Sequence, residues 1–425
     1  MTALSPGTGA RSDSSSGVHH RRTLCRACGA ASLRPFLALG NQPLANAFLR
    51  TKADIAQEQF FPLDVYFCET CSLVQLADVI DPEVLFGHYI YVTGTSETIA
   101  AHNVKYAQAV VEDLSLGPAD LVVEIASNDG SLLSCFTGHG VRTLGVEPAR
   151  NIAEMARARH IDTVNEFFNS ATARAVREKY GTAQAVIGNN VLAHVDETRD
   201  FLTGARTLIS DTGRVIVEVP YAQDMLDRLE YDTVYHEHLC YFSITSLARL
   251  GREVGLGVAR VDRVPVHGGS IRVWFAKDVP HSEQAEALMA EERRVGLTTF
   301  AAWEAFGRAA AENKTALRLL LEQLRSEGRT VAGYGAPAKG NTLLNYCGVD
   351  TALLPYTVDR NPLKVGTMTP GMHIPVLPVE TLLARMPDYV LILAWNFADE
   401  IVRQQQQYQE RGGRFILPIP SPRVI

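Results

Sequence analysis

Short apolar runs alternate with longer amphipathic stretches along most of the chain. Between residues 81 and 285 a helical pattern covers 98–114, and the apolar runs that follow it are 121–125, 143–146, 185–187 and 215–219. Short apolar runs separated by helices are typical of a parallel sheet that is covered on both faces. The pattern therefore predicts a central α/β domain.

The same alternation returns near the end of the chain. Residues 282–328 contain no proline and read as two helical segments, with Gly328 as a plausible stop. Apolar runs and helical stretches then alternate again, with runs at 330–334, 356–358, 389–393 and 415–417. We expect a helical connection followed by a second, smaller α/β domain.

The first residues have a different character. Residues 1–22 are rich in Ser, Gly and Thr and end in two His and two Arg, which predicts a disordered tail. Residues 23–80 carry two cysteine pairs and few helix signals. The predicted organisation is a tail at 1–22, a small module at 23–80, a central domain at 81–285, and a helical connection with a C-terminal domain at 286–425.

Composition narrows the possible partners. The chain has 425 residues, 46% of them hydrophobic, and a formal net charge of −7, which argues against a nucleic-acid backbone as the main partner. No apolar run reaches the length of a membrane span, and the N-terminus lacks the apolar core of a secretory signal. Seven cysteines, only four of them paired in spacing, suit a reduced, cytoplasmic protein.

The paired cysteines predict a metal site. Two Cys-x-x-Cys motifs supply four thiolates: Cys25, Cys28, Cys68 and Cys71. Zinc prefers tetrahedral sulfur coordination, and four protein ligands leave no open position for water. We therefore expect a structural zinc ion that helps a module of small core to fold.

The first apolar run of the central domain leads into a loop of small and polar residues. Glu124 lies in this run and Glu147 ends the next strand, while the predicted cofactor loop contains Ala126, Ser127, Asn128, Asp129 and Gly130. A carboxylate at the position of Glu147 can accept ribose hydroxyls. The loop lacks the G-x-G-x-x-G fingerprint that serves a pyrophosphate, and its acidic groups suit a sulfonium and an amino group. These features favour S-adenosylmethionine.

Two further clusters extend the predicted site. Asn189 and Asn190 follow the third run of the central domain, where we expect them over the cofactor crevice. Tyr235-His236-Glu237-His238 places four polar side chains in succession, which makes an acid/base role plausible. An extended segment would put His236 and His238 on one face, whereas a tight turn would separate them. The spacing does not match the H-E-x-x-H zinc motif.

The C-terminal domain carries a second glycine-rich loop. Gly333-Tyr334-Gly335 and the residues up to Ala338 satisfy G-x-G-x-x-A, and Asp359 closes the next run. A helix N-terminus beside Lys339 would hold a phosphate. A substrate-binding loop, a structural remnant and a working NAD site are the alternatives at this point. His373 and Trp395 are interpreted as packing residues.

Together these motifs resemble the three-part, zinc-containing sugar C-methyltransferases of deoxysugar and antibiotic pathways. The resemblance covers residues 24–425 and rests on the four cysteines, on the loop from Glu124, on 189–195, on 235–239 and on 333–342. One departure is Ala126, where the family usually has Gly. We expect this alanine to crowd the cofactor loop slightly.

The resemblance implies a fold and a reaction. It implies a zinc module, a class I Rossmann-like methyltransferase domain and a second Rossmann-like domain. It implies methyl transfer to the carbon beside the ketone of a TDP-linked 4-keto-6-deoxysugar, with His238 as base. The residues implied to orient the sugar, tune the base or hold the oxyanion are Tyr235, Glu237, His194 and Tyr89. Those implied to bind the nucleotide sugar are Tyr334, Gly335, Lys339 and Asn341.

Other functions fit parts of the sequence. An O- or N-methyltransferase could use the same scaffold, and the C-terminal loop could serve an NAD-dependent nucleotide-sugar oxidoreductase or a non-catalytic nucleotide-binding module. The exact sugar, the methylated carbon and the oligomeric state are left open by the sequence.

Overall fold

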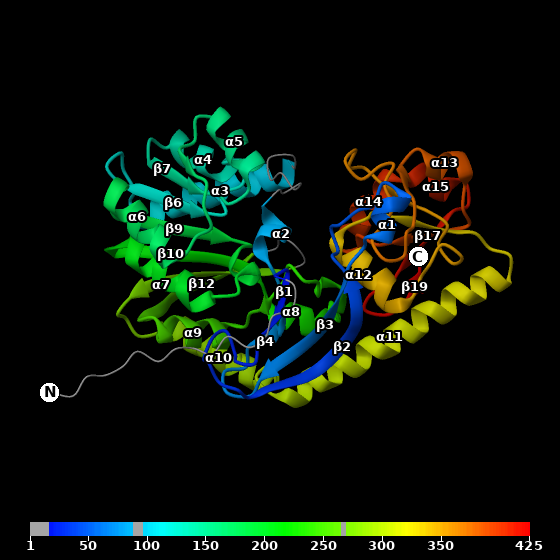
Figure 1. The fold of residues 1–425 in the computed structure, drawn as a ribbon, viewed down its shortest axis with the longest axis horizontal. Helices are drawn as coiled ribbons and strands as arrows, with labels where there is room; N and C mark the ends of the chain where they lie inside the picture. The colour runs from blue at the N-terminus through cyan, green and yellow to red at the C-terminus, as the bar shows by residue number, and fades with distance from the viewer. Residues whose placement is uncertain (1–16, 88–96, 265–268) are drawn as a thin grey trace.

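The computed structural model describes residues 17–87, 97–264 and 269–425. The chain forms three units (Figure 1): a small β module, a central α/β domain, and a C-terminal α/β domain flanked by a long helix. The module's long strands reach from the central domain toward the C-terminal domain.

The module is built on an antiparallel sheet of order β11-β4-β3-β2. Its elements are β2 (Leu33–Pro43), α1 (Lys52–Ala56), β3 (Phe60–Cys68), β4 (Val74–Leu76), α2 (Pro82–Phe86) and β11 (Cys240–Tyr241). Strand β11 comes from the central domain, so the two units share a sheet. The tail prediction is wrong for residues 19–21, because strand β1 (His19–Arg21) pairs with β5 (Asp78–Ile80) and His19 and Arg21 bind the Asp78 carboxylate.

The central sheet has seven strands in the order β12-β13-β10-β9-β6-β7-β8. Its strands are β6 (Leu121–Ile125), β7 (Arg142–Val146), β8 (Thr163–Val164), β9 (Ala183–Asn189), β10 (Ile209–Pro220), β12 (Leu256–Val264) and β13 (Ser270–Lys277). The five strands β10, β9, β6, β7 and β8 are parallel as expected. Strand β13 runs antiparallel to both of its neighbours, β10 and β12. Chain order reverses between β6 and β9, which is where open α/β sheets bind ligands.

Helices cover both faces of this sheet. They are α3 (Glu97–Leu114), α4 (Ser131–Gly138), α5 (Arg150–Ala158), α6 (Ser170–Tyr180), α7 (Thr198–Leu208), α8 (Ala222–Arg228) and α9 (Ile244–Glu253). Alternate residues of β6 enter different cores: Val122 packs with side chains of α3 and α4, whereas Val123 packs with those of α6 and α7. Burial of both faces explains why the strands read as continuous apolar runs.

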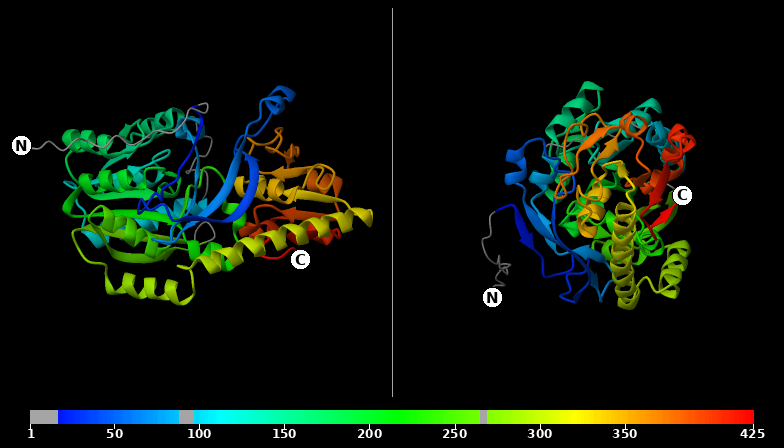
Figure 2. Two further views of the ribbon diagram at one scale, coloured as in Figure 1. Left: turned by 60° about the horizontal axis from the view of Figure 1, so that its bottom comes forward. Right: turned by 90° about the vertical axis from the view of Figure 1, so that its right-hand side faces the viewer.

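Two helices connect the α/β domains. Helix α10 (Glu283–Arg294) packs against α9, and α11 (Phe300–Ser326) runs alongside the C-terminal domain and contacts β2 and α12 (Figure 2). The chain leaves α11 through Gly328, whose φ is +72°. This matches the predicted stop.

The C-terminal domain repeats the layered α/β arrangement. Its sheet has the order β16-β15-β14-β17-β18-β19 and is parallel except for β19. The elements are β14 (Val331–Tyr334), α12 (Ala338–Cys347), β15 (Thr357–Asp359), β16 (Val376–Pro378), α13 (Thr381–Arg385), β17 (Tyr389–Ile392), α14 (Ala398–Gln404), α15 (Gln406–Glu410), β18 (Arg414–Leu417) and β19 (Arg423–Val424). The order reverses between β14 and β17.

Candidate functional site

The four paired cysteines converge at one end of the module. Cys25 and Cys71 have their Sγ atoms 3.5 Å apart, those of Cys28 and Cys68 are 3.6 Å apart, and all four lie within 4.8 Å of one another. Tetrahedral zinc with bonds of about 2.3 Å has sulfur atoms about 3.8 Å apart, so the donor set fits this ion. The Gln75 amide donates to Cys25 Sγ at 3.1 Å and orients one ligand.

The zinc module is tied to the central domain by a buried arginine. Arg26 follows the first cysteine and is 2% exposed; its guanidinium binds Asp196 at 3.0 Å and also the Leu76 carbonyl. The Thr198 hydroxyl donates to the Arg26 carbonyl at 3.2 Å. Folding of the cysteine cluster therefore fixes the start of helix α7.

The loop after β6 has the conformation that a closely approaching ligand requires. Ala126, Asn128 and Gly130 have φ values of +53°, +50° and +74°. These left-handed residues alternate with buried Ser127 and Asp129. The cost of a left-handed alanine explains why glycine suits position 126 better, and it makes the departure at Ala126 a matter of backbone strain rather than of crowding alone.

Three carboxylates surround this loop. Glu147 accepts the Asn128 N–H at 2.9 Å and the Ala149 N–H at 2.8 Å, so it holds the loop while further lone pairs can accept ribose hydroxyls. Asp129 accepts the hydroxyl of Ser131, the first residue of α4, at 2.6 Å and pairs with Arg159 at 2.8 Å. Burial, together with the charges of Glu147 and Asp129, raises the pKa of Glu124 well above its usual range.

Buried polar atoms in this corner fit a bound cofactor. Among the described residues, Glu124 Oε2 and Ser127 Oγ are buried without a hydrogen-bond partner in the protein. Such atoms are costly unless a ligand or water satisfies them. An acidic, partly unsatisfied corner suits the cationic methionine end of S-adenosylmethionine.

The end of β9 carries the predicted asparagines and links the cofactor corner to the histidines. Asn189 accepts the Tyr106 hydroxyl at 3.2 Å, and Asn190 has a φ of +52° and donates its N–H to the Glu218 carbonyl at 2.7 Å. A short 3-10 helix then delivers His194. Strand β9 thus places cofactor and acid/base candidates at one sheet edge.

A buried network behind Asn189 was not predicted from the sequence. Arg272 pairs with Glu218 at 2.8 Å and stacks its guanidinium over the Tyr106 ring, 3.5 Å from the ring centroid. The apolar pattern of one strand cannot reveal a pair whose members come from two strands, β10 and β13. The signal that could have found it is a charged residue within each of two apolar runs.

The 235–238 segment turns sharply, which separates its two histidines. The backbone N–H of His238 donates to the backbone carbonyl of Tyr235 at 2.8 Å. His236 is 1% exposed, with Nε2 at 3.2 Å from the Pro62 carbonyl of the zinc module. Burial lowers the pKa of His236 to about 4. His236 therefore lies in the interface between the central domain and the zinc module.

Both ring nitrogens of His238 lie within hydrogen-bond distance of a described group. Nδ1 lies 2.9 Å from the Thr233 carbonyl and Nε2 lies 2.7 Å from the Tyr235 hydroxyl. A carbonyl only accepts, so Nδ1 carries the proton in the neutral ring and Nε2 holds the lone pair. The His194 ring packs edge-on against His238 with centroids 5.0 Å apart, and burial lowers the pKa of His194 to about 4.

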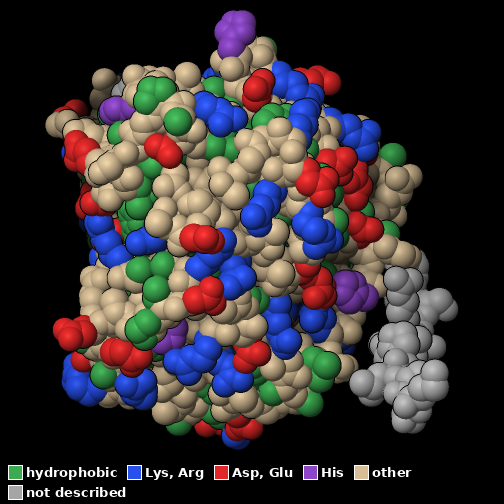
Figure 3. Space-filling view, turned by 90° about the vertical axis from the view of Figure 1, so that its left-hand side faces the viewer, with side chains coloured by type: hydrophobic (Ala, Val, Ile, Leu, Met, Phe, Trp, Pro, Cys, Tyr) green, Lys and Arg blue, Asp and Glu red, His purple; other side chains and the backbone are tan. Residues whose placement is uncertain are grey.

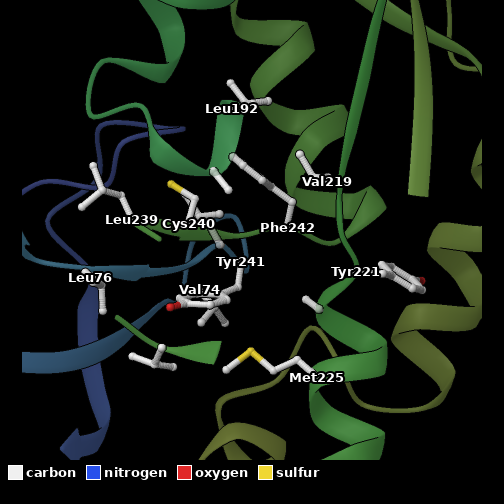
Figure 4. Close-up of a cluster of buried hydrophobic side chains, with 14 of the residues drawn as sticks. Val74, Leu76, Leu192, Val219, Tyr221, Met225, Leu239, Cys240, Tyr241 and Phe242 are labelled. Atoms are coloured by element: carbon white, nitrogen blue, oxygen red, sulfur yellow. The ribbon is translucent and has the colours of Figure 1, made fainter. Parts of the chain in front are cut away.

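The strand that follows His238 anchors it. Leu239, Cys240, Tyr241 and Phe242 insert among Val74 and Leu76 of the module and Leu192, Val219, Tyr221 and Met225 of the central domain (Figure 4). Strand β11 also pairs with β4 through Cys240 and Tyr241. The histidine segment is therefore held by a core common to two domains.

Glu237 faces away from His238 toward the module. Its Oε1 accepts the Asn46 amide at 2.6 Å, and burial raises its pKa to about 7, opposed by Asn46 and the charge of Lys364. Tyr89, the remaining predicted member of the cluster, lies outside the described residues. The structure thus brings Tyr235, His194 and His238 together and gives Glu237 a different neighbourhood.

The glycine-rich loop of the C-terminal domain is closed by its own side chains. Asp359 accepts the Ala336 N–H at 2.7 Å, the Lys364 ammonium donates to the Ala336 carbonyl at 2.8 Å, and Gly335 has a φ of +87°. Tyr334 is buried below the loop. Asn341, predicted to bind substrate, is 1% exposed and donates to the Ala45 carbonyl at 2.7 Å, so it ties α12 to the module.

Lys339 and Trp395 meet beside the central domain. The Lys339 ammonium lies 4.0 Å from the centroid of the Trp395 ring. Burial lowers the pKa of Lys339, and the negative charges of Asp232 and Glu230 oppose this effect. Trp395 donates its indole N–H to Asp232 at 2.7 Å. His373 lies 2.7 Å from Glu58. The packing interpretation of Trp395 and His373 is wrong in this respect, because both side chains make polar contacts across domain boundaries.

Charges on the outer face of the central domain are mixed. Lys and Arg side chains alternate with Asp and Glu over the described residues visible in Figure 3. Arg206–Asp278 and Arg260–Asp113 are ion pairs on the surface of this domain. An intermingled surface differs from the one-signed stripe that binds a nucleic-acid backbone. No helix within the described ranges is long and apolar enough to cross a bilayer.

The fold and the site define a class of protein. A seven-stranded sheet that reverses order between β6 and β9, an acidic cofactor corner at that point and a four-thiolate cluster define a methyltransferase that uses S-adenosylmethionine and contains zinc. Family models match accordingly: a zinc binding domain at residues 25–86, a methyltransferase domain at 100–261 and a C-methyltransferase C-terminal domain at 265–420.

A curated relative matches nearly the whole chain. C-methyltransferase NovU of Streptomyces niveus is 39% identical over 404 residues, which are 94% of this chain and 96% of the relative. The chain belongs to this C-methyltransferase family. Methyl transfer to carbon is therefore its activity.

Solved structures align with less than half of the chain. Magnesium protoporphyrin IX methyltransferase from Synechocystis PCC 6803 with bound SAM is 13% identical, covers 46% of this chain and 88% of its own, and has a TM-score of 0.32. The CcbJ methyltransferase from Streptomyces caelestis is 14% identical, with coverages of 42% and 90% and a TM-score of 0.33.

Proposed function

We propose that the protein methylates the carbon beside the ketone of a nucleotide-linked, in particular TDP-linked, 4-keto-6-deoxysugar. The observation that carries this proposal is the hydrogen bonding of His238, which in the neutral imidazole places the proton on Nδ1 and the lone pair on Nε2. A carbon beside a ketone is acidic enough for such a base when the enolate oxygen is stabilised. Bound S-adenosylmethionine supplies the electrophilic methyl group.

Tyr235 has two tasks in this proposal. Its hydroxyl donates to His238 Nε2 at 2.7 Å, which holds the base ready before substrate enters. When substrate enters, the hydroxyl turns from Nε2 to the ketone oxygen, where negative charge develops. This frees the single lone pair of Nε2 to take the α-proton. His194, kept neutral by burial, packs against the base and limits its movement.

Cofactor binding is assigned to the corner around β6 and β9. Glu147 and Glu124 contribute carboxylate oxygens to the ribose and the amino group, while Ser127, Asn128, Asp129 and Gly130 let the ligand approach the backbone at Ala126. Asn189 and Asn190 line the neighbouring strand end. These groups bind and orient the methyl donor, and the 3-10 helix after β9 carries the site to His194.

Nucleotide binding is assigned to the loop after β14. Lys339 begins helix α12 and provides a cation at a helix N-terminus, which suits a diphosphate. Gly335 and Tyr334 shape the loop. The amide nitrogen of Asn341 donates to the module, whereas its Oδ1 is buried without a partner among the described residues and is kept as a candidate contact to the ligand. Lys339 lies over the Trp395 ring, and Trp395 donates to Asp232, which shortly precedes the 235–238 segment; we infer that the sugar of a nucleotide bound there faces the base.

Incubation with S-adenosylmethionine and TDP-4-keto-6-deoxyglucose, with mass and NMR analysis, tests the substrate and the methylated carbon. In deuterated water without cofactor, exchange of the α-proton reports deprotonation alone. His238→Ala should lower turnover and exchange by about 10²–10⁴-fold while leaving cofactor affinity intact. His236→Ala is the control, with thermal unfolding measured for both. Full turnover by His238→Ala would overturn the assignment.

A further inference from the structure

The carbonyl that fixes the tautomer of His238 belongs to a short 3-10 helix, Tyr231–Thr233. Thr233 O is 2.9 Å from His238 Nδ1. The helix is one turn long and starts after Leu229, which has a left-handed φ of +57°. So short an element has little stability of its own, and its position depends on what its side chains bind.

One side chain of this helix is held by the C-terminal domain. Asp232 is fully buried, and its Oδ2 accepts the Trp395 indole N–H at 2.7 Å. Trp395 begins a short 3-10 helix, Trp395–Phe397, after β17, and Lys339 lies over its ring. A hydrogen bond from an indole to a buried carboxylate is among the stronger kinds, because the acceptor is charged and water is absent.

A second side chain is held by the connecting helix. Tyr231 is also fully buried and donates its hydroxyl to Asn313 Oδ1 at 2.8 Å. The Asn313 amide in turn donates to the carbonyls of Pro418 and Pro420, each at 2.9 Å. Both anchors of the 3-10 helix therefore lie outside the domain that holds the cofactor corner.

We propose that Asp232 and Trp395 are positioning residues, through which the C-terminal domain sets the tautomer of the catalytic base. The inference rests on the proposed role of His238. With the pair intact, the Thr233 carbonyl stays on Nδ1 and the lone pair stays on Nε2. Without it, the 3-10 helix shifts and the ring can protonate at Nε2, a form that cannot accept the α-proton there.

Trp395→Phe removes the indole donor and retains an aromatic ring beneath Lys339. We expect kcat and the rate of α-proton exchange to fall about ten-fold, with the KM for S-adenosylmethionine unchanged. Trp274→Phe is the matched control, because Trp274 also donates its indole N–H to a carboxylate, Asp262 at 2.9 Å, at the far edge of the central sheet. Equal loss in the two variants would overturn the proposal.

Variants at Asp232 complete a double-mutant cycle. Asp232→Ala should lower kcat as Trp395→Phe does. The double variant should be no slower than either single variant, because each substitution removes the same hydrogen bond between the indole and the carboxylate. Asp232→Asn keeps an oxygen that accepts the indole N–H and should restore most of the rate. Additive losses, or an Asn variant as slow as the Ala variant, would contradict the role.

The tautomer itself can be observed without substrate. In protein labelled with ¹⁵N-histidine, the His238 signals, assigned by their loss in His238→Ala, should show Nδ1 protonated in the wild type. In Trp395→Phe they should show a mixture of both tautomers, while the Trp274→Phe spectrum should match the wild type. An unchanged tautomer in Trp395→Phe would overturn the inference. If the tautomer responds but no keto sugar is methylated, only the proposed substrate fails.

Discussion

The two α/β domains contain the same corner with opposite charge. Each sheet reverses chain order beside its first strand, and each first loop is closed by an acid from the next strand. Glu147 accepts the Asn128 N–H at 2.9 Å, and Asp359 accepts the Ala336 N–H at 2.7 Å. Up to this point the two corners are built alike.

They differ in what surrounds the loop. The corner of the central domain adds Glu124 and Asp129, whereas that of the C-terminal domain adds Lys339 and Lys364. A sulfonium and an amino group favour the first, and a diphosphate favours the second. The same loop arrangement can therefore bind ligands of opposite charge. The backbone sets the shape of the loop, while a few side chains set its charge.

Removing zinc should disrupt both corners together, because the module touches both domains. Asn341 beside the C-terminal loop binds the Ala45 carbonyl, and Asp196 of the central domain binds Arg26. Elemental analysis should find one zinc per chain. Cys68→Ser, or chelation, should yield unstable protein that has lost the binding of both ligands. Cys135→Ser, outside the cluster, should bind both normally, and normal binding by Cys68→Ser would refute the role.

Removing each acid in turn should show whether the corners are independent. Glu147→Ala removes the proposed hydrogen bonds to the ribose and also frees the Asn128 N–H, so affinity for S-adenosylmethionine should fall roughly ten-fold or more. Asp359→Ala removes the equivalent acid and should leave that affinity unchanged. Titration calorimetry measures both. An unchanged affinity for Glu147→Ala would remove this residue from the cofactor site.

A lysine substitution tests the basic corner in the same way. Lys339→Ala should weaken the binding of TDP by about ten-fold, a loss of about 1.4 kcal/mol, with S-adenosylmethionine unaffected. Lys314, which lies over the Tyr346 ring at 4.4 Å on α11, provides a matched cation–π control. If Lys314→Ala weakened TDP binding equally, the effect would be one of packing or overall charge.

The smallest expected effect concerns the strained alanine. Ala126→Gly should relieve the cost of a φ of +53°, and we expect stability to rise by about 0.5–1 kcal/mol. Ala336, in the other corner, does not have a positive φ, so Ala336→Gly should lower stability by a similar amount. Thermal unfolding of both variants decides the matter, and a destabilised Ala126→Gly would show that the loop gains from the methyl group.

Patterns local in sequence were read correctly. The long apolar runs at 121–125 and 389–393 became β6 and β17, and the two cysteine pairs met as their spacing required. The sequence pattern does not predict strands β12 and β13. In the structure β13 runs antiparallel to β10, a partner that lies much earlier in the chain. Register between distant strands is set by tertiary packing, which no local period records.

Roles that depend on contacts between domains escaped the sequence. Nothing local distinguishes His236 from His238, yet one contacts Pro62 and the other Thr233 and Tyr235. The family resemblance implies that Asn341 binds substrate, and only the structure shows that its amide nitrogen also donates to the Ala45 carbonyl of the module. For His236 and Asn341, the contact that the sequence does not reveal is made with a partner far away along the chain.

The contacts between the first and last parts of the chain also constrain the order in which the protein can be made. Leu49 forms a β-bridge with Met368, and His373 reaches back to Glu58. During synthesis the module emerges first, but its outer end finds these partners only after about 300 further residues have left the ribosome. The zinc ion can organise the cysteine end early, whereas the end that carries α1 must wait exposed until the second α/β domain has formed.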